Sequence, residues 1–400
     1  MVPQFLKSRL ARHAVYPISR AMVVSLRQIL SVDRRVASLT PAGRPCGHTL
    51  LSYGIEGFFF PPGDPRWYDH PAYRETCEMA RAFLERGYTV DVISYANSEF
   101  VPHKPYDVLV DCRTNLERLA PLLPAGSVKI MHLDTSHWLF NNTAQHLRTL
   151  ALQERRGVTI GWSKRATPNW GLERADCATM LGNEVTARTY TYAGKRIYPL
   201  PVVPTALYPW PEEKDFERCR RSFLWLGSDG FVHKGLDLVL EVFAARPNLQ
   251  LTVCGPIQRE PMFERAYFRE LYQTSNIRTV GWVNMGSREF VDIANSCVAL
   301  VYPSCAEGQS GAVVSCLHAG LLPIVSAQSG VDVREDFGLL LRECSLAEIG
   351  AAVEQVAELP AACLRETARR AWEFARARHT WERYGAEYRR ALGEILSGRT

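Results

Sequence analysis

A cluster of prolines near the middle of the chain divides it into two halves. Five prolines fall within thirteen residues, at positions 199, 201, 204, 209 and 211. Because proline lacks an amide hydrogen and fixes φ, this segment forms neither a helix interior nor a central strand. The 400 residues also exceed what one hydrophobic core usually serves. The cluster therefore predicts a stiff linker between two domains.

On both sides of the linker, short apolar segments alternate with helical stretches. Helices are expected at 72–85, ending before Gly87, and at 235–245, where apolar residues recur at i, i+3, i+4 and i+7. The expected strands are 49–52, 89–93, 107–110, 128–133, 157–160, 223–226, 249–255, 277–281, 298–302 and 321–326. This alternation predicts an α/β fold of two doubly wound domains with parallel sheets. Such sheets bind ligands beyond the carboxyl ends of their strands, so the cleft between the domains is the expected site.

The composition excludes several classes of protein. With 46% hydrophobic and 22% charged residues, the chain is neither disordered nor of low complexity. A net charge of +5 is too small to indicate a nucleic-acid partner. No apolar stretch is long enough to span a bilayer, and the first residues lack the apolar core of a secretory signal. The 11 cysteines include no Cys-x-x-Cys pair, which argues against a disulfide framework or zinc site and favours a cytoplasmic protein.

The first 32 residues are basic and contain no carboxylate before Asp33. Their basic residues are Lys7, Arg9, Arg12, Arg20 and Arg27. Apolar residues lie between them, so the segment is amphipathic. Two interpretations stay open: a peripheral contact with the anionic inner face of a membrane, or a helix packed on the protein with its basic face in solvent.

A glycine-containing loop follows the strand expected at 223–226. Gly227, Ser228 and Gly230 allow close approach to the backbone, and Lys234 stands directly before a helix. Free amide groups at a helix start, together with a lysine, suit a phosphate or diphosphate. The alternative is an ordinary turn between a strand and a helix, with Lys234 in solvent.

A second loop of small residues, 307–311, follows the strand expected at 298–302 and also opens a helix. Its backbone amides could bind an anion, and the carboxylate of Glu307 could accept hydrogen bonds from sugar hydroxyls. The alternative for Glu307 is a charge that only complements the helix dipole.

Taken together, in this order and about 75 residues apart, the two loops resemble the C-terminal domain of retaining GT-B glycosyltransferases of the group 1, family 4 type. The resemblance is strong in the C-terminal half and looser over the rest of residues 45–395. The matching motifs are Lys234-Gly235, Pro303-Ser304, Glu307-Gly308, Ala319-Gly320 and Pro323-Ile324-Val325. It implies two Rossmann-like domains that face a cleft, and a nucleoside diphosphate sugar as donor substrate.

The resemblance also implies a division of the chain into five parts. These are a basic N-terminal segment at 1–44, an acceptor domain at 45–203, the linker at 204–221, a nucleotide-sugar domain at 222–375, and a helix at 376–400 that crosses back to the first domain. The apolar stripe of that last helix, with Trp381 and Tyr384 among its members, supports the crossing.

Residue roles follow from the resemblance. Lys234 would bind the donor diphosphate and offset the charge that develops on the leaving group, while Glu307 would hold sugar hydroxyls. His132, at the end of the strand 128–133, is similar to a histidine near the reacting sugar; His137 is the substitute, and a buried core histidine is the alternative. The base would lie between the loops after Cys254 and Gly281. The expected donor-binding residues are Gly227, Ser228, Gly230, Gly255, Gly281, Gly308, Gln309, Ser310, Gly311 and Ser315.

The chain departs from the family pattern at two positions. Ser315 stands where the family has a second glutamate that binds ribose, and losing such a charged hydrogen bond costs about 1.5 to 3 kcal/mol. Ser228 stands where the family has an arginine, so phosphate binding would rest on Lys234, with His233 or a basic residue from elsewhere. No Asp-x-Asp triplet is present, so neither a metal nor a cofactor is expected.

The sequence therefore predicts a metal-independent, retaining hexosyltransferase that acts on a glycan, lipid-linked or small-molecule acceptor, as in the synthesis of cell-envelope or surface polysaccharide. One alternative is another GT-B enzyme, such as a nucleotide-sugar epimerase. The other is a non-catalytic relative that binds a nucleotide or sugar as the partner of an active transferase.

Overall fold

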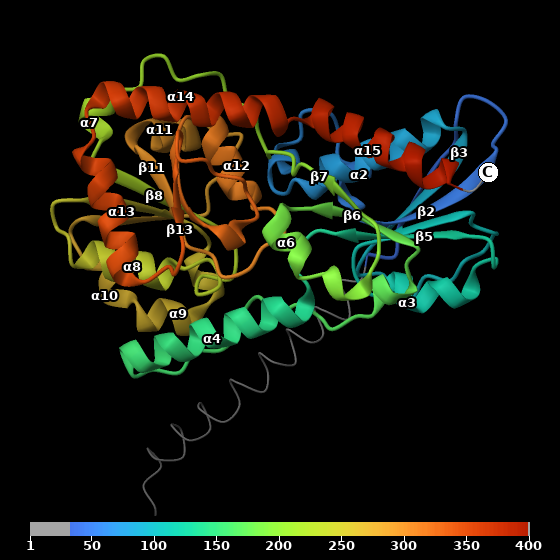
Figure 1. The fold of residues 1–400 in the computed structure, drawn as a ribbon, viewed down its shortest axis with the longest axis horizontal. Coiled ribbons are helices and arrows are strands. Elements are labelled where there is room, and N and C mark those ends of the chain that lie inside the picture. The colour runs from blue at the N-terminus through green and yellow to red at the C-terminus, as the bar shows by residue number, and fades with distance from the viewer. Residues whose placement is uncertain (1–32, 399–400) are drawn as a thin grey trace, which may run out of the picture.

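The computed structural model describes residues 33–398, so the basic segment at 1–32 lies outside the described residues. The described chain forms two α/β domains side by side (Figure 1). The strands are β1 (Val36–Leu39), β2 (Gly47–Tyr53), β3 (Tyr88–Ser94), β4 (Val108–Asp111), β5 (Val128–Leu133), β6 (Cys177–Leu181), β7 (Ile197–Leu200), β8 (Ser222–Leu226), β9 (Gln250–Cys254), β10 (Ile277–Gly281), β11 (Ala299–Tyr302), β12 (Leu322–Ser326) and β13 (Leu339–Leu341).

Helices pack around both sheets (Figure 1). They are α2 (Ala72–Glu85), α3 (Asn115–Leu119), α4 (Trp138–Arg156), α5 (Gly171–Arg174), α6 (Glu184–Arg188), α7 (Phe216–Cys219), α8 (Leu236–Ala244), α9 (Pro261–Ala266), α10 (Phe268–Tyr272), α11 (Arg288–Ser296), α12 (Gly311–His318), α13 (Leu346–Glu358), α14 (Ala361–Arg378) and α15 (Trp381–Ser397). The helix expected at 72–85 is confirmed by α2, which is followed by Gly87 in the left-handed region at φ 84°.

The sheet of the N-terminal domain has the strand order β1-β3-β2-β4-β5-β6-β7, and that of the C-terminal domain β10-β9-β8-β11-β12-β13. Every pairing is parallel except that of β1 with β3. Parallel strands are buried on both faces, which explains why segments such as Val108–Asp111 are entirely buried. The predicted fold class, two Rossmann-like domains, is therefore confirmed.

Two sequence-based expectations differ from the structure. The N-terminal sheet begins with β1 at Val36, before the predicted domain boundary at residue 45, because β1 pairs with the edge strand β3. Residues 157–160 are not a strand; the sheet continues instead with β6 and β7. These strands were missed because β6 is only five residues long, and β7 contains Pro199, which an edge strand tolerates.

The linker and the last two helices fasten the domains to each other. The indole Nε1 of Trp372 in α14 donates to Tyr208 O at 3.1 Å, and that of Trp381 in α15 donates to Pro204 O at 3.0 Å. Helix α15 packs on α2 of the N-terminal domain, where Arg389 forms an ion pair with Glu85. The chain thus crosses between the domains twice, at the linker and at α15 (Figure 1).

Candidate functional site

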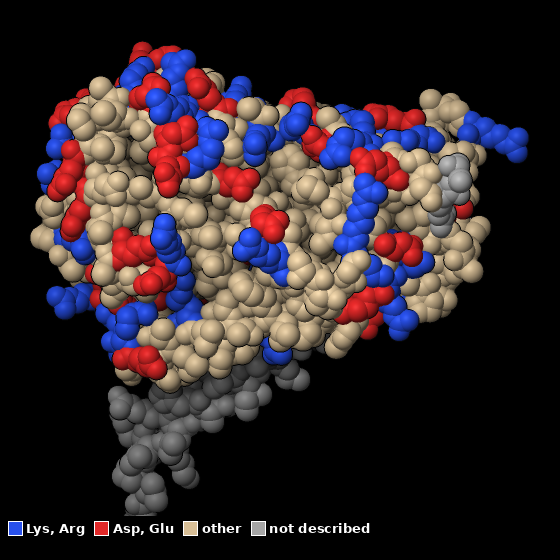
Figure 2. All heavy atoms as spheres, in the orientation of Figure 1, with Lys and Arg blue, Asp and Glu red and all other residues tan. Residues whose placement is uncertain are grey.

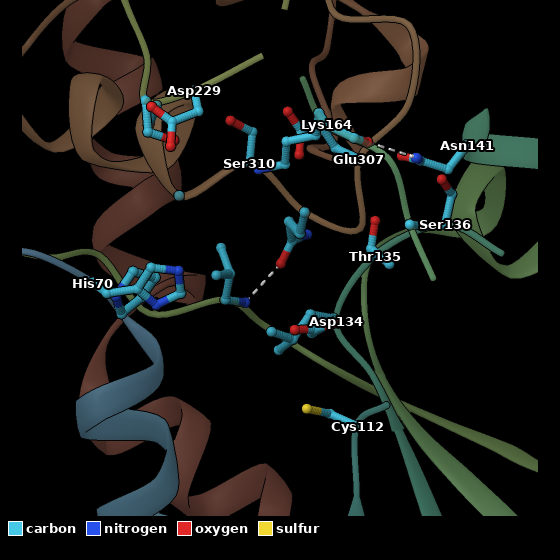
Figure 3. A pocket seen from close by; sticks show the side chains of 18 of the residues that line it. His70, Cys112, Asp134, Thr135, Ser136, Asn141, Lys164, Asp229, Glu307 and Ser310 are labelled. Carbon is cyan, nitrogen blue, oxygen red and sulfur yellow. Dashed lines mark hydrogen bonds between the residues drawn. The ribbon is translucent and has the colours of Figure 1, made fainter. Parts of the chain in front are cut away.

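A cleft of about 700 Å³ lies between the domains, at the carboxyl ends of both parallel sheets. The N-terminal domain lines it with the residues that follow β4 and β5, and with a loop at 163–167. The C-terminal domain lines it with the residues that follow β8, β9 and β11, and with the start of α12. Figure 3 shows side chains from both domains pointing into this space.

The loop between β8 and α8 is folded tightly around Lys234. The Nζ of Lys234 donates to Asp229 O at 2.6 Å, and its amide donates to Gly230 O at 2.8 Å. A Cβ at Gly227 would lie 2.7 Å from the ring of Trp225 and 2.9 Å from Lys234 Cδ, so only glycine fits there. The predicted residues Gly227, Ser228 and Lys234 all line the cleft.

Glu307 lies beside Lys234 on the C-terminal side of the cleft. Its Oε1 accepts a hydrogen bond from the hydroxyl of Tyr302 at 2.9 Å, and lies 4.0 Å from Lys234 Nζ and 3.9 Å from His233 Nε2. Burial by itself would raise the pKa of Glu307, but the charges of Lys234 and Lys164, with the hydrogen bond from Tyr302, outweigh it and the pKa is lowered. Glu307 is therefore ionised at neutral pH.

The cations around Glu307 are weakened by the same burial. Burial, together with the charge of Lys164, lowers the pKa of Lys234 to about 7. Burial lowers the pKa of His233 to about 3, so this ring is neutral, and among the described residues its Nδ1 has no hydrogen-bond partner. The arrangement places the Glu307 carboxylate next to Lys234. An anion that binds beside Lys234 would raise its pKa, so that the lysine would be fully protonated.

The loop 307–311 lines the cleft and also contacts the other domain. A Cβ at Gly308 would lie 2.5 Å from Asp134 O, and Gly308 O accepts from Thr186 Oγ1 at 2.7 Å. The side chain of Gln309 accepts from Val202 N at 2.6 Å and donates to Gly330 O at 3.0 Å. Gly308 and Gln309 therefore connect domains and linker.

The predicted donor residues of α12 are also partly engaged within the protein. Ser310 caps α12 by accepting from Val313 N, and its own amide donates to Ser329 O at 2.9 Å, so this amide is not free to bind phosphate. Ser315 is fully buried and lies 3.3 Å from Thr205 Oγ1 in the linker. Both residues, and Gly311, still border the cleft, as does Gly255; Gly230 and Gly281 are not among its lining residues.

His132 is not in the cleft. Its ring is fully buried in the sheet, with Nδ1 2.9 Å from Thr179 Oγ1 and the ring of Tyr53 edge-on at 5.0 Å. Burial lowers its pKa to about 4, which makes it a neutral core residue. The prediction failed because side chains alternate along a strand, and position 132 faces away from the cleft. His137 does line the cleft, where it caps α4 and contacts Tyr192 OH at 3.2 Å.

The N-terminal domain contributes charged residues that sequence reasoning missed. Arg113, after β4, forms a two-pronged ion pair with Asp134, after β5, in which Nη2 donates to Oδ2 at 2.8 Å. Lys164 enters from the loop after α4 and lies beside Glu307 (Figure 3). Their positions at strand ends were the available signal for Arg113 and Asp134; nothing in the sequence singled out Lys164.

Glu75 is a buried carboxyl group that also borders the cleft. It lies on α2 and accepts from Tyr53 OH at 2.9 Å and from Val203 N, in the linker, at 3.4 Å. Burial raises its pKa to about 7, against the lowering effect of these two hydrogen bonds. It therefore changes charge near neutral pH, at the point where α2 meets the linker.

No protein-family model matches the chain, and no curated protein matches it. Solved structures do. Sucrose-phosphate synthase from Thermosynechococcus elongatus superimposes with a TM-score of 0.61 at 14% identity, covering 89% of this chain and 100% of that one. HepE from Anabaena, in complex with UDP and glucose, superimposes with a TM-score of 0.55 at 12% identity, covering 88% of this chain and 99% of HepE. WaaG, a glycosyltransferase involved in lipopolysaccharide biosynthesis, superimposes with a TM-score of 0.52 at 17% identity, covering 87% of this chain and 99% of WaaG. Over nearly their whole length, the chain has the GT-B fold of these glycosyltransferases.

Proposed function

We propose that the chain transfers a sugar from a nucleoside diphosphate donor to an acceptor bound in the cleft. The observation that carries the proposal is the meeting of Lys234 and Glu307, from the two loops that the sequence singled out, 4.0 Å apart at the carboxyl ends of β8 and β11. A cation suits the diphosphate, and a carboxylate held ionised suits the sugar hydroxyls. The structural neighbours, among them HepE in complex with UDP and glucose, support the donor class.

We further propose that the transfer retains the configuration at the anomeric carbon. The bond between this carbon and the β-phosphate oxygen breaks, and the nucleoside diphosphate leaves with the electron pair. The acceptor oxygen then bonds to the carbon from the same face and passes its proton to the leaving phosphate. Lys234 lowers the barrier by stabilising the charge on that phosphate, without a metal ion.

The acceptor would bind on the N-terminal side of the cleft. Arg113 and Asp134 border this side as an ion pair, and Tyr95 and Trp138 add aromatic surface of the kind on which sugar rings pack. A hexose as the transferred group and a glycan as acceptor fit these side chains.

A lipid-linked acceptor at the inner face of a membrane is supported by the outer face of α4. The buried residues of this helix are Asn141, Gln145, Thr149 and Leu152, whereas several of its other apolar residues are exposed. The exposed apolar residues of α4 and its neighbours are Leu139, Phe140, Leu147, Leu150, Trp162 and Met262. The surface over α4 shows few charged side chains (Figure 2). No helix within residues 33–398 is long and apolar enough to span a bilayer, so such contact would be peripheral.

The proposed activity is tested by incubating the chain with UDP-, GDP-, ADP- and TDP-sugars and measuring release of the free diphosphate. Binding of each diphosphate is measured in parallel by calorimetry, and the anomeric configuration of the product by NMR. One diphosphate should bind, and its sugar should be turned over. For membrane contact, Leu147→Glu should reduce sedimentation with phosphatidylglycerol vesicles, whereas Leu122→Glu, at an exposed residue outside α4, should not.

A non-catalytic role is the second candidate, and it is favoured by specific contacts. Gln309 and Ser315 were both expected to serve the donor, but the side chain of Gln309 bonds to Val202 N and that of Ser315 to Thr205 in the linker. His132 lies in the core. Tight binding of a diphosphate without release from any sugar donor would support this role over transfer.

A further inference from the structure

Lys164 belongs to the N-terminal domain but extends toward the donor loops of the C-terminal domain. Its backbone is held by α4: Asn141 Nδ2 donates to Lys164 O at 3.2 Å, and Asn142 both donates to Ala166 O and accepts from Ala166 N at 2.9 Å. Figure 3 shows the first of these bonds. The loop that carries Lys164 is therefore fixed by side chains of a long helix.

The side chain of Lys164 lies against the loop after β8. A Cβ at Gly230 would be 3.0 Å from Lys164 Cβ and 3.2 Å from its Cδ, and Gly230 has φ of 93°, which suits glycine. The aliphatic stem of Lys164 thus crosses the space between the domains at the loop that also contains Lys234. Figure 3 shows it beside Glu307.

Two lysines, one from each domain, come together at this point. Glu307 lies 4.0 Å from Lys234 Nζ, and a second carboxylate, Glu260, accepts from Gly230 N and also acts on Lys234. Within residues 33–398, Lys164 forms no ion pair. Asp134, another carboxylate of the cleft, pairs with Arg113. The mutual repulsion of the two ammonium groups adds to the effect of burial in lowering the pKa of Lys234. A ligand carrying two negative charges would remove this repulsion.

We infer that Lys164 is the second cation of the diphosphate site, contributed by the N-terminal domain to a donor that the C-terminal domain otherwise holds. The inference rests on the proposed donor class. Ser228, the cleft residue that begins the loop after Gly227, is uncharged, so this loop supplies one cation, Lys234. A diphosphate that contacts both lysines joins the two domains, so the site is complete only when the cleft is closed.

The test compares Lys164→Met with the wild type in calorimetric titrations with each nucleoside diphosphate and the matching monophosphate. Methionine keeps the stem that packs on Gly230 and removes only the charge. The substitution should weaken diphosphate binding about tenfold or more, and monophosphate binding far less, because a monophosphate does not reach both cations. Lys195→Met, at a lysine outside the cleft, makes the same change in net charge and should leave both affinities unchanged.

A second variant tests whether the charge itself matters. In Lys164→Met/Ser228→Arg, a cation from the C-terminal domain replaces the lost one, and diphosphate affinity should recover at least partly. The unfolding midpoint without ligand, measured for every variant, should match that of the wild type.

The outcomes separate the two proposals. If the wild type binds none of the diphosphates, the proposed function fails. If the wild type binds one and Lys164→Met binds it equally well, or loses mono- and diphosphate to the same degree, the role of Lys164 is overturned while the proposed function stands. A Lys164→Met protein that does not fold is replaced by Lys164→Gln, for which the same outcomes apply.

Discussion

The two halves of the cleft are built differently. In the C-terminal half, Lys234 and Glu307 come from short loops that connect a strand to the next helix, so neighbours in sequence are neighbours in space. In the N-terminal half, Glu75, Arg113 and Lys164 come from three separate parts of the chain. A site made of local loops leaves a motif in the sequence, whereas a site assembled by tertiary packing does not.

The halves also differ in charge. Arg113 is neutralised by Asp134 in the N-terminal half, while Lys234 in the C-terminal half lies near Glu307 and is also exposed to the charge of Lys164 from the other domain. We therefore expect the C-terminal half to control anion binding and the N-terminal half to control the acceptor and the closure of the cleft.

The largest effect is expected from Lys234→Met, which removes the cation of the C-terminal loop. Binding and turnover of the donor should fall about a hundredfold or more, because a buried charge that stabilises the leaving group is worth about 3 to 4 kcal/mol. The measurement is single-turnover release of the diphosphate, with Lys195→Met as control. Unchanged release would show that the C-terminal half is not where the anion binds.

Glu75 provides a test from the N-terminal half. Its pKa, raised by burial to about 7 from 4.5, means that the folded state holds the proton more tightly than the unfolded state. The contribution of Glu75 to the free energy of unfolding is therefore complete below pH 4.5 and is lost as the pH rises through 7. Glu75→Gln, which stays neutral, should therefore gain stability relative to the wild type by about 2 kcal/mol between pH 5.5 and pH 8.

The measurement is urea unfolding of both proteins at the two pH values. Glu78→Gln, at a half-buried residue of α2 that pairs with Arg81 and with Arg389 of α15, serves as control and should show no comparable change. A constant difference between Glu75→Gln and the wild type would mean that Glu75 is ionised throughout and is compensated by a neighbouring charge.

These differences explain what the sequence could and could not predict. Alternation of strands and helices, with the prolines between them, was enough for the fold, because both follow from local periodicity and backbone chemistry. Lys234 and Glu307 could be placed for the same local reason, although their roles stay predictions. His132 was misplaced because one residue of register decides which face of a strand a side chain takes. Lys164 could not be found, since only the packing of α4 brings it to Gly230.

Gly308→Ala tests the contact between the halves directly. The added Cβ would lie 2.5 Å from Asp134 O, a backbone atom, so the two loops must separate. We expect a cost of about 1 kcal/mol, or about a fivefold loss of donor affinity, as the cleft opens. Small-angle scattering should show a larger radius of gyration. Gly126→Ala, where nothing lies within 4 Å of the new atom, should change neither quantity; an unchanged radius for both would contradict the contact.

The smallest effect is expected from Ser315→Ala. Ser315 Oγ lies 3.4 Å from Thr205 N and 3.3 Å from Thr205 Oγ1, which are long, weak hydrogen bonds. Losing them should lower the free energy of unfolding by about 0.5 kcal/mol and change donor affinity by less than about twofold. Both are measured on the same preparation, by urea unfolding and by calorimetry.

Ser315→Ala also tests how far along α12 the donor site extends. If affinity falls about tenfold while stability is unchanged, Ser315 contacts the donor, and the C-terminal half extends beyond the first turn of α12. If stability falls and affinity does not, α12 serves the linker from Ser315 onward, as the contact with Thr205 indicates. The donor would then be held mainly by Glu307, Lys234 and the lysine that the other domain supplies.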